Sequence, residues 1–354
     1  MKIMFITDLF PVKEDEKYTP KTLLNFVKNW ESLGHQVTVV KPDFLPNSFL
    51  RGKPYYKEGL YGNIIKLNYF TPFFSKRKLE KYYDISEYDI VIAHMPVGIL
   101  FANSLGVDYI AGVHISDLEI LTNPLYSFYF RNKLKNAYKK AKAIACRSYV
   151  LKNKFLNVFP ELENKTFVAP SGVDKSIIIK RQVNSEPTRI ITCSQLIRRK
   201  NIDKLILAVD KFPNARLIVI GDGKEKNRLQ KLAKTNVVFK GWCSHNEVLE
   251  YMRNSDIFIL PSAKETFGMV YLEAMASGCI TCGIKNEGID GIIKNNENGF
   301  LLENANVDEI IKFLDFVFNC KQLQSINDNA YNTIVDYADE ICAENYLKKI
   351  LQFI

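Results

Sequence analysis

Short apolar segments recur along this chain, and intervals long enough for a helix separate most of them. Segments of this kind are typical of strands that are buried on both faces of a sheet. They are residues 2–7, 36–40, 64–68, 89–94, 108–114, 143–147 and 166–169, and then 189–193, 215–220, 236–240, 256–260 and 279–283. Because strands that alternate with helices form parallel sheets covered by helices, the pattern predicts an α/β protein. Ligands are expected at the carboxyl ends of the strands.

The apolar segments fall into two series, which predict two Rossmann-like domains. We expect an N-terminal domain over residues 1–183 and a C-terminal domain over residues 184–337, joined by the polar stretch 180–188. A chain of 354 residues, of which 47% are hydrophobic, is long enough to form two separate cores. The amphipathic segment 338–354 predicts a last helix. A ligand site is expected in the cleft between the two halves.

Cysteine usage and the N-terminal sequence predict a cytoplasmic location. The chain has seven scattered cysteines, an odd number without a disulfide framework, which fits a reducing compartment. After Lys2 a short strand-like run ends at Asp8, so no signal-peptide pattern is present. The longest uncharged interval, residues 90–107, contains polar residues such as His94 and Asn103. It therefore predicts a strand, a turn and a helix rather than a membrane span.

The segment after the apolar run 257–260 points most directly to a function. Residues 261–278 read Pro-Ser-Ala-Lys-Glu-Thr-Phe-Gly-Met-Val-Tyr-Leu-Glu-Ala-Met-Ala-Ser-Gly, which predicts a loop and the start of a helix. The N-terminus of a helix stabilises an anion such as a phosphate, and Gly268 lets the backbone approach it closely. Glu265 and Glu273 could accept hydrogen bonds from hydroxyl groups on either side of that anion. The spacing alone also fits an ordinary helix start, in which acidic residues complement the helix dipole.

This segment resembles the Glu-x7-Glu signature of glycosyltransferase family 4, with Glu265 and Glu273 as the two glutamates. The flanking Pro-Ser, Phe-Gly and Glu-Ala-Met-Ala-Ser-Gly sequences match as well. The resemblance covers nearly the whole chain and is strongest over residues 189–303. It implies a retaining enzyme with the GT-B fold, in which two Rossmann-like domains face each other across a cleft. It also implies that the C-terminal helix returns to the N-terminal domain, which binds the acceptor.

The resemblance implies a donor site for a nucleotide-diphosphate sugar in the C-terminal domain. Family members hold the diphosphate with an Arg and a Lys after the first strand of this domain. Here Lys200 matches, whereas Ser194 and Gln195 replace the usual Gly-Arg. Arg198 or Arg199 could supply the missing charge, or they could form a solvated pair. The other donor-binding residues implied are Glu273 at the ribose, Phe267, Gly268, Met269 and Val270 at the phosphates, and Gly241 and Trp242 at the base.

Three residues are implied to take part in the transfer itself. Glu265 would hold a sugar hydroxyl, and Lys200 would stabilise the charge that develops on the leaving diphosphate. His114 ends an N-terminal strand, at a place where the family has a His near the transferred sugar. Without the resemblance, a single His is more often a structural hydrogen-bonding residue. His94 has a weaker claim, and His35 and His245 are expected at the surface.

Several motifs are missing from the sequence, and their absence narrows the chemistry. No Asp-x-Asp triplet occurs, and Cys279-x2-Cys282 has no second cysteine pair, so we expect no metal. No Gly-x-Gly-x-x-Gly follows a predicted strand and no Walker loop is present, which weakens dehydrogenase and NTPase functions. We therefore expect no cofactor apart from the donor substrate. The chain also carries residues 14–20 where many family members have a Gly-Gly pair.

The formal net charge is +9, and the basic excess lies in the N-terminal half. Residues 1–183 contain 27 Lys and Arg against 17 Asp and Glu. The positive charge is concentrated in residues 73–81 and 126–142, where aromatic residues are interleaved with it. This pattern fits contact with an anionic membrane surface, or a solvated helix face whose aromatic residues enter the core. Nucleic acid is a third partner class, but no nucleic-acid motif supports it.

Together these features predict transfer of a sugar, UDP-linked in the main hypothesis, to a glycan or lipid-linked acceptor. The product would belong to a cell-envelope polysaccharide or glycoconjugate, such as lipopolysaccharide or capsule. The enzyme would be cytoplasmic, with peripheral contact to the inner face of the cytoplasmic membrane. Two alternatives stay open at this point. The chain could be another GT-B enzyme, such as an epimerase or a phosphorylase, or a non-catalytic protein that binds membranes or sugar nucleotides.

Overall fold

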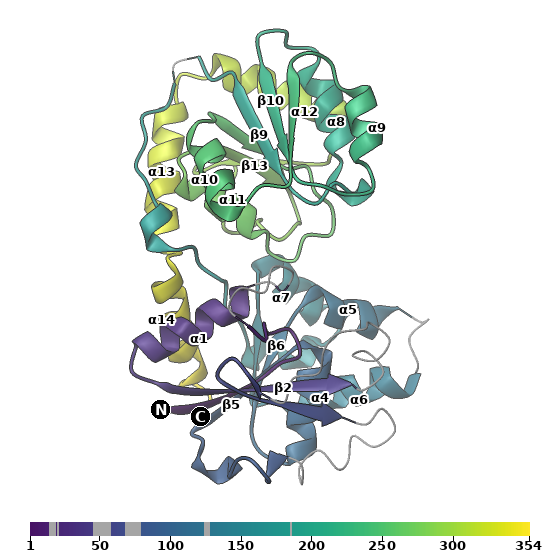
Figure 1. Cartoon of the computed structure of the whole chain (residues 1–354), viewed down its shortest axis with the longest axis vertical. Coiled ribbons are helices and arrows are strands. Elements are labelled where there is room, and N and C mark those ends of the chain that lie inside the picture. The colour runs from purple at the N-terminus through teal and green to yellow at the C-terminus, as the bar shows by residue number, and fades with distance from the viewer. Residues whose placement is uncertain (14–18, 20, 45–57, 68–78, 124–127, 185) are drawn as a thin grey trace. The chain divides into compact units, whose positions relative to one another are not determined.

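The computed structural model describes residues 1–13, 19, 21–44, 58–67, 79–123, 128–184 and 186–354. The chain folds as two compact units. The N-terminal unit contains residues 1–147, 151–171 and 339–354, and the C-terminal unit contains residues 148–150 and 172–338. In Figure 1 the first unit runs from purple to blue and ends with the yellow helix α14 (Asp339–Ile350). Two sequence predictions fall largely outside the described residues: only residue 19 of 14–20 and residues 79–81 of 73–81 are described.

The chain enters the C-terminal unit earlier than the polar stretch 180–188 suggests, because the residues before that stretch are bound to this unit. The Val173 N–H donates to the Tyr337 carbonyl at 2.9 Å, and the Ile179 N–H donates to the Ala276 carbonyl at 2.8 Å. Arg181 forms an ion pair with the buried Asp256 at 3.2 Å. The division therefore falls after Ser171 instead of after residue 183.

The N-terminal unit contains an eight-stranded sheet in the order β3-β4-β2-β1-β5-β6-β7-β8. All neighbouring strands are parallel except β3 and β4, which form a short antiparallel pair. The strands are β1 (Lys2–Ile6), β2 (Gln36–Phe44), β3 (Glu58–Gly59), β4 (Gly62–Leu67), β5 (Ile90–His94), β6 (Ile110–Val113), β7 (Ala143–Cys146) and β8 (Thr166–Val168). The seven strands predicted for this half are confirmed, and β3 is an addition.

Helices cover this sheet on both faces, and each face has its own core. Successive residues of β1 alternate between the cores, with Met4 and Ile6 in one and Ile3 and Phe5 in the other. The first core contains side chains of α4 (Met95–Leu105), α5 (Ile115–Thr122), α6 (Phe128–Lys140) and α7 (Tyr149–Leu156). The second contains side chains of α1 (Thr22–Ser32) and α14.

The C-terminal helix belongs to the N-terminal unit, as the resemblance implied. Tyr346, Leu347 and Ile350 of α14 are buried in the core that this helix shares with α1. The Trp30 indole N–H of α1 donates to the Ala343 carbonyl at 2.9 Å. Figure 1 shows the two helices side by side. Burial of the apolar face of α14 anchors the C-terminal end of the chain against α1, which lies more than 300 residues earlier in the sequence.

The C-terminal unit contains a six-stranded parallel sheet in the order β11-β10-β9-β12-β13-β14. The strands are β9 (Arg189–Cys193), β10 (Arg216–Ile220), β11 (Val237–Gly241), β12 (Ile257–Ile259), β13 (Ile280–Ile284) and β14 (Phe300–Leu302). Five of them were predicted as the second series of apolar segments. The order places β9 and β12 next to each other at the centre, so the loops that follow them meet at one edge of the sheet.

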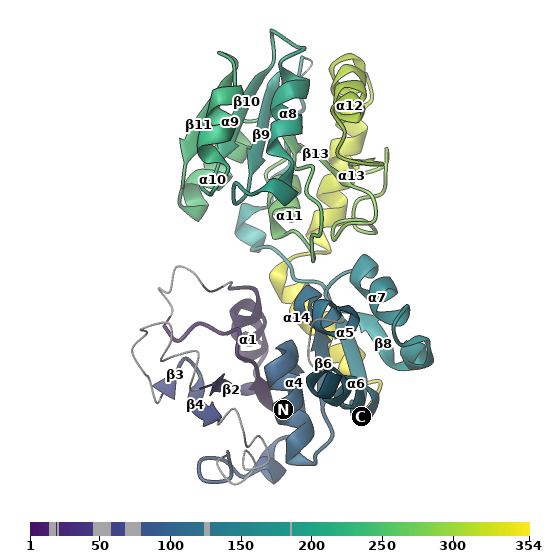
Figure 2. The same cartoon turned by 90° about the vertical axis from the view of Figure 1, so that its right-hand side faces the viewer.

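Six α-helices are described in the C-terminal unit and form two groups. In one group α8 (Ile202–Val209) packs against α9 (Lys226–Leu232) and α12 (Val307–Asn319), and Figure 2 shows α8 and α9 over β9 and β10. In the other, α11 (Met269–Ala276) packs against α10 (His245–Arg253) and α13 (Leu323–Val335). The predicted α/β class with two parallel sheets is confirmed.

Candidate functional site

Two loops of the C-terminal unit are joined by hydrogen bonds at the edge where β9 and β12 end. We call residues 194–201 the basic loop and residues 261–268 the Glu265 loop. The Asn201 side-chain amide donates to the Pro261 carbonyl at 2.9 Å, and the Ala263 N–H donates to the Arg199 carbonyl at 2.8 Å. Asn201 adopts a left-handed conformation with φ 52°, which Asn tolerates better than most residues, and it joins a 3-10 helix (Arg198–Lys200) to α8. These contacts fix the basic loop against the Glu265 loop.

Lys200 and Glu265 meet where the two loops are joined. The Lys200 Nζ lies 2.5 Å from Glu265 Oε2, and the Ser262 hydroxyl donates to the same oxygen at 2.9 Å. Lys200 is buried, with 7% of its surface exposed. The Glu265 N–H donates to the Glu287 carboxylate at 2.7 Å, which holds the loop backbone. Of these four residues, the sequence identified Lys200 and Glu265 as site residues, but not Ser262 or Glu287.

The structure separates the two arginines that were candidates for the missing family Arg. The Arg199 guanidinium donates to the Ala263 carbonyl at 3.3 Å and lies 3.8 Å from Glu265 Oε2. Arg198 instead pairs with Glu225 at 3.7 Å, and its side chain is 89% exposed. Arg199 therefore adds its charge to the Lys200–Glu265 pair, whereas Arg198 forms its ion pair with Glu225, outside the two loops.

Helix α11 begins at the end of the Glu265 loop, without a side-chain cap. Gly268 is the N-cap residue and has φ 83°, and a Cβ there would lie 2.5 Å from the Tyr271 ring. Only glycine fits this position without strain. The Phe267 side chain is buried in the core, so of this residue only the backbone is available to a ligand. Met269 and Val270 occupy the first turn, where helix N–H groups favour an anion.

Glu273 contacts a histidine that the sequence placed at the surface. Glu273 lies on α11, and its Oε1 is 3.1 Å from the Nε2 of His245, the first residue of α10. The His245 side chain is 60% exposed, so the prediction that His245 lies at the surface is confirmed. The sequence missed the contact because nothing in it reveals that α10 packs against α11.

The residues expected at the base lie at the end of β11. The Gly241 carbonyl accepts a hydrogen bond from the Gly221 N–H at 2.8 Å, so it serves to join β11 to the turn after β10. A Cβ at Gly221 would lie 1.9 Å from the Ser194 carbonyl oxygen. The turn at residues 221–223, which reads Gly-Asp-Gly, thus lets the basic loop pack closely against it. Trp242 is 70% exposed, which leaves its indole available for stacking.

His114 belongs to the N-terminal unit, where it is the N-cap residue of α5 after β6. Its N–H donates to the Asp117 carboxylate at 2.7 Å, and its Nε2 lies 3.0 Å from Nδ1 of His94. Burial, with a contribution from the charge of Arg147, lowers the pKa of His114 to about 3. Burial raises the pKa of Asp117 to about 7. His114 is therefore neutral near pH 7, which suits contact with a hydroxyl group better than donation of a proton.

Helix α6 accounts for most of the basic segment 126–142, and the aromatic residues of this helix are divided between the core and the surface. Tyr138 is fully buried, whereas Phe128 and Tyr129 are 71% and 64% exposed. Lys133 Nζ lies 4.2 Å from the centre of the Tyr129 ring. Lys139 pairs with Glu161 at 3.1 Å, so part of the positive charge is balanced within the unit. The burial of Tyr138 fits a helix face whose aromatic residues enter the core, and contact with a membrane stays a prediction.

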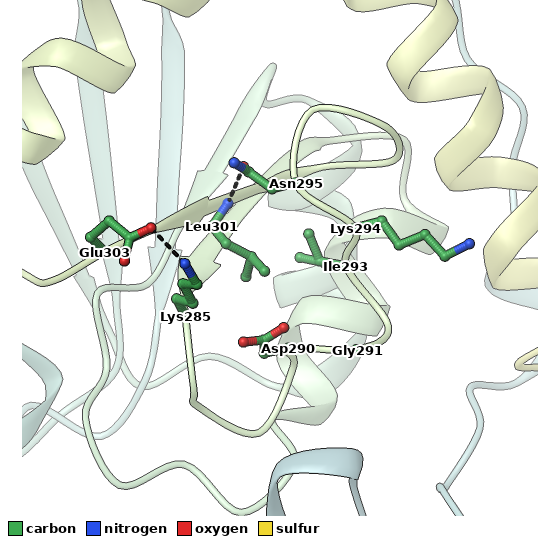
Figure 3. A pocket seen from close by; sticks show the side chains of 8 residues that line it. All are labelled: Lys285, Asp290, Gly291, Ile293, Lys294, Asn295, Leu301 and Glu303. Carbon is green, nitrogen blue, oxygen red and sulfur yellow. Dashed lines mark hydrogen bonds and ion pairs between the residues drawn. The ribbon is translucent and has the colours of Figure 1, made fainter.

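One surface pocket of about 280 Å³ contains none of the predicted site residues. Figure 3 shows its lining, in which the Lys285 ammonium reaches the Glu303 carboxylate at 2.8 Å and the Leu301 N–H donates to the Asn295 side chain at 2.9 Å. Among the residues that the structure describes, no group of three His, Cys, Asp or Glu side chains could hold a metal ion. Over the same described ranges, no helix is long and apolar enough to cross a membrane.

Two family models match this chain and together cover most of it. The model described as glycosyl transferases group 1 matches residues 174–333, and the model described as Glycosyltransferase Family 4 matches residues 20–177. This chain belongs to glycosyltransferase family 4. The family 4 chain is therefore a transferase, as the Glu-x7-Glu signature implied.

Known proteins agree with this assignment. An uncharacterized glycosyltransferase of Methanocaldococcus jannaschii is 28% identical over 251 residues, which are 70% of this chain and 69% of the relative. A UDP-Gal:alpha-D-GlcNAc-diphosphoundecaprenol alpha-1,3-galactosyltransferase of Escherichia coli is 31% identical over 140 residues, which are 38% of this chain and 35% of the relative. The family 4 chain spans about half or less of the length of several other curated relatives that it matches.

The solved structure of Anabaena HepE in complex with UDP has a TM-score of 0.75 and 18% identity to this chain, and all of both chains is covered. This likeness confirms the predicted GT-B fold.

Proposed function

We propose that this chain transfers a sugar from a UDP-sugar, with retention of configuration, to a glycan or lipid-linked acceptor of the cell envelope. The observation that carries the proposal is the buried Lys200 paired with Glu265 directly before the uncapped N-terminus of α11. Two names support the substrate classes: HepE binds UDP, and the Escherichia coli relative is named for a UDP-galactose donor and a lipid-diphosphate acceptor.

The leaving group would be stabilised by positive charge and by helix N–H groups. When the bond between the anomeric carbon and the diphosphate breaks, its electron pair stays on the phosphate oxygen and negative charge develops there. Lys200 and Arg199 provide cations beside the Glu265 loop, and the first turn of α11 provides N–H donors. Because these groups are held in place before the substrate binds, they need little reorganisation during the reaction.

Glu265 would orient the transferred sugar by accepting a hydrogen bond from one of its hydroxyl groups. The contacts from Lys200 and Ser262 go to Oε2, so Oε1 is the atom that we assign to the sugar. On α11, Glu273 would accept from the ribose hydroxyls, with His245 holding its other side. In the N-terminal unit, neutral His114 would contact a hydroxyl group of the sugar. The acceptor would attack the anomeric carbon on the face that the diphosphate leaves.

A transfer assay tests this function. The protein is incubated with a panel of UDP- and GDP-sugars and with lipid-linked or glycan acceptors, and the glycosylated product and free nucleotide are quantified by mass spectrometry. We expect acceptor-dependent release of UDP, and a drop of about 100-fold in turnover for Glu265→Gln. The matched control is Glu297→Gln, an exposed glutamate in the same unit, which should keep wild-type turnover. Sugar isomerisation without an acceptor would indicate an epimerase, and donor binding without turnover would indicate a non-catalytic protein; either result would contradict the proposal.

We propose that α6 brings the enzyme to an anionic membrane surface, where a lipid-linked acceptor is found. Its exposed Phe128 and Tyr129 lie beside Arg131 and Lys133, a combination that suits the headgroup region of a bilayer. Cosedimentation with vesicles that contain anionic lipid should exceed that with zwitterionic vesicles. Phe128→Ala with Tyr129→Ala should reduce it several-fold, whereas Leu207→Ala, at an exposed position of the other unit, should not. Equal binding to both kinds of vesicle would refute this part of the proposal.

A further inference from the structure

A third loop lies beside the Glu265 loop at the carboxyl edge of the C-terminal sheet. Strand β13 pairs with β12 in parallel, so the segment that follows β13 leaves the sheet next to the Glu265 loop. We call residues 285–291 the Glu287 loop. The Glu287 carboxylate accepts a hydrogen bond from the Glu265 N–H at 2.7 Å. A hydrogen bond from a backbone N–H to a carboxylate is stronger than one between two neutral groups.

The backbones of these two loops also pack against each other. Gly288 is buried, and a Cβ at this position would lie 2.4 Å from the Phe267 nitrogen and 2.6 Å from the Thr266 carbonyl carbon. These distances are too short for a side chain, so any other residue at position 288 would push the Glu287 loop away from the Glu265 loop. The glycine after Glu287 thus keeps the carboxylate within hydrogen-bonding distance of the Glu265 N–H.

The Glu287 loop is a closed turn, which holds the Glu287 carboxylate in one place. The Asn286 N–H donates to the Asp290 carboxylate at 2.7 Å, and the Asp290 N–H donates to the Glu287 carbonyl at 2.8 Å. Asn286 has φ 61°, a left-handed conformation that Asn tolerates better than most residues. Ile289 has no exposed surface and lies in the core of the C-terminal unit. Two hydrogen bonds and a buried side chain therefore fix the backbone that carries Glu287.

The peptide unit between Lys264 and Glu265 is held on both sides. Its N–H donates to Glu287, and its carbonyl oxygen accepts from the Arg199 guanidinium at 3.4 Å. Lys264 has φ 58°, a left-handed conformation that is uncommon for a residue with a long side chain and costs free energy. Because an unfavourable conformation persists only where its surroundings impose it, we infer that these two contacts keep the backbone at Glu265 in place.

The side chain and the backbone of Glu265 thus have different partners. Lys200 and Ser262 bind the carboxylate, whereas Glu287 binds the backbone N–H. The basic loop, which carries Lys200, is bonded to the first three residues of the Glu265 loop, ahead of the N–H that Glu287 holds. Loss of the Glu287 contact should therefore move Glu265 and leave the basic loop where it is.

We propose that Glu287 is a positioning residue for the transfer, which fixes the backbone at Glu265 so that the Glu265 carboxylate meets the sugar in one orientation. This inference rests on the proposed contact between Glu265 and a sugar hydroxyl group. In this role Glu287 contacts neither the sugar nor the diphosphate. It acts on the sugar end of the donor through Glu265, whereas binding of the diphosphate depends on the basic loop.

Two substitutions of Glu287 separate this role from a general contribution to stability. Glu287→Ala removes the acceptor, whereas Glu287→Gln keeps a side-chain oxygen that can accept from the Glu265 N–H. With the UDP-sugar that the transfer assay identifies, Glu287→Ala should lower kcat by about tenfold, the effect of one lost hydrogen bond to a charged group. Glu287→Gln should recover most of this loss.

The affinity for UDP, which has no sugar, provides the internal control. Its Kd should stay within about twofold of wild type in both variants, because the basic loop is unchanged. Glu297→Ala, at an exposed glutamate that also follows β13, should match the wild type in kcat and in this Kd. A Glu287→Ala protein that no longer binds UDP would show that Glu287 supports the whole unit, and this result would overturn the inference.

Hydrogen exchange of the Glu265 amide, followed by NMR, gives a readout that does not depend on turnover. A hydrogen-bonded amide proton exchanges slowly with solvent. In the wild type and in Glu287→Gln this proton should exchange slowly, and in Glu287→Ala it should exchange about tenfold faster or more. Fast exchange in the wild type, or equal exchange in all three proteins, would overturn the inference. Equal loss of kcat in the two Glu287 variants would also overturn it.

Failure of this inference and failure of the proposed function give different results. If Glu265→Gln lowers turnover and Glu287→Ala does not, the inference fails and the proposed function stands. If the wild type transfers no sugar from any UDP-sugar, the proposed function fails. The exchange rates then decide by themselves whether Glu287 holds the backbone at Glu265.

Discussion

The two units stabilise their buried polar groups in opposite ways. The C-terminal unit uses opposite charges: Lys200 pairs with Glu265, and Asp256 binds two arginines. In the N-terminal unit the His94–His114 pair is neutral near neutral pH, because burial lowers the pKa of both histidines, and the charge of the buried Arg147 lowers them further. The difference matches the proposed ligands, since a diphosphate needs cations whereas a sugar hydroxyl needs uncharged hydrogen-bonding partners. Substitutions in the C-terminal unit should act through charge, and those in the N-terminal unit through geometry and pH.

Removal of the buried lysine should have the largest effect. Lys200→Ala takes away the cation nearest to Glu265 and leaves that carboxylate without its 2.5 Å partner. We expect kcat/KM for transfer to fall by about 100- to 1000-fold, as when one preorganised group that stabilises a transition-state charge is lost. Lys211→Ala, an exposed lysine of the same unit, is the control and should stay within about twofold. A loss below tenfold for Lys200→Ala would show that the site does not rely on this charge.

The charge cluster at Asp256 should dominate stability in the C-terminal unit. The Asp256 side chain is 1% exposed and accepts hydrogen bonds from Arg189 at 2.7 Å and from the Thr188 N–H at 3.2 Å. Asp256→Asn should lower the free energy of unfolding by about 2–3 kcal/mol at pH 7, somewhat less than for a fully buried pair because Arg189 is partly exposed. Urea denaturation measures this value. Asp315→Asn, at an exposed position, should change it by less than about 0.5 kcal/mol.

Asp256→Asn should also change how the free energy of unfolding depends on pH. Burial alone would raise the pKa of Asp256, but the hydrogen bonds and charge of Arg189 outweigh it and hold this pKa below its usual value. The pair therefore stabilises the fold above about pH 4, and this stability is lost as the pH falls further. The difference between wild type and Asp256→Asn should shrink below pH 4. A difference that stays constant down to pH 3 would contradict the charged state of the pair.

The neutral histidines of the N-terminal unit should make stability depend on pH at higher pH values than the Asp256 pair does. The pKa of His114 is about 3 in the folded chain and about 6.5 when unfolded, so the unfolded chain takes up a proton first as the pH falls. His114 should therefore cost the fold about 1–2 kcal/mol between pH 6.5 and pH 5. Asp117, whose pKa burial raises to about 7, acts in the opposite direction. The informative measurement is thus the slope of the free energy of unfolding against pH, compared between wild type and His114→Asn. An identical slope in the two proteins would mean that His114 is not buried in its neutral form.

Substitution of Arg199 in the basic loop should have the smallest effect on ligand binding, and the neighbouring Arg198 provides a closely matched control. Arg199 lies 3.8 Å from Glu265, whereas Arg198 pairs with Glu225. Arg199→Ala should raise the Kd for UDP by about three- to tenfold, as expected for a partly exposed cation near a phosphate. Arg198→Ala should change this Kd by less than twofold. Isothermal titration calorimetry compares them, and the reverse order would show that Arg198 supplies the missing charge.

The sequence predicted the fold well because local patterns carry it. Twelve short apolar segments were assigned as strands, and all twelve are strands of the two sheets. The short β3 (Glu58–Gly59) was missed because two residues carry no recognisable pattern. The domain boundary was placed at the polar stretch instead of at Ser171, because polarity marks exposed chain and does not reveal that Arg181 is tied to Asp256.

The candidate site was predictable only where a motif names its residues. Glu265 came from the family signature and Lys200 from the resemblance of the loop after the first strand of the C-terminal domain, and the structure brings the two together. The choice between Arg198 and Arg199 depends on the left-handed Asn201 and on the short 3-10 helix before it, which a sequence does not reveal. The partners of His94 could not be foreseen because Tyr346 lies 252 residues further along the chain.

The most direct test of the account is the affinity for UDP and for its sugar conjugate, measured by calorimetry in wild type, Lys200→Ala and His114→Ala. The account predicts that Lys200→Ala weakens the binding of both ligands by about tenfold or more, because the cation contacts the diphosphate that they share. It predicts that His114→Ala leaves the Kd for UDP within about twofold and weakens only the UDP-sugar. A wild-type protein that binds neither ligand, or a His114→Ala variant that loses UDP as strongly as Lys200→Ala does, would contradict it.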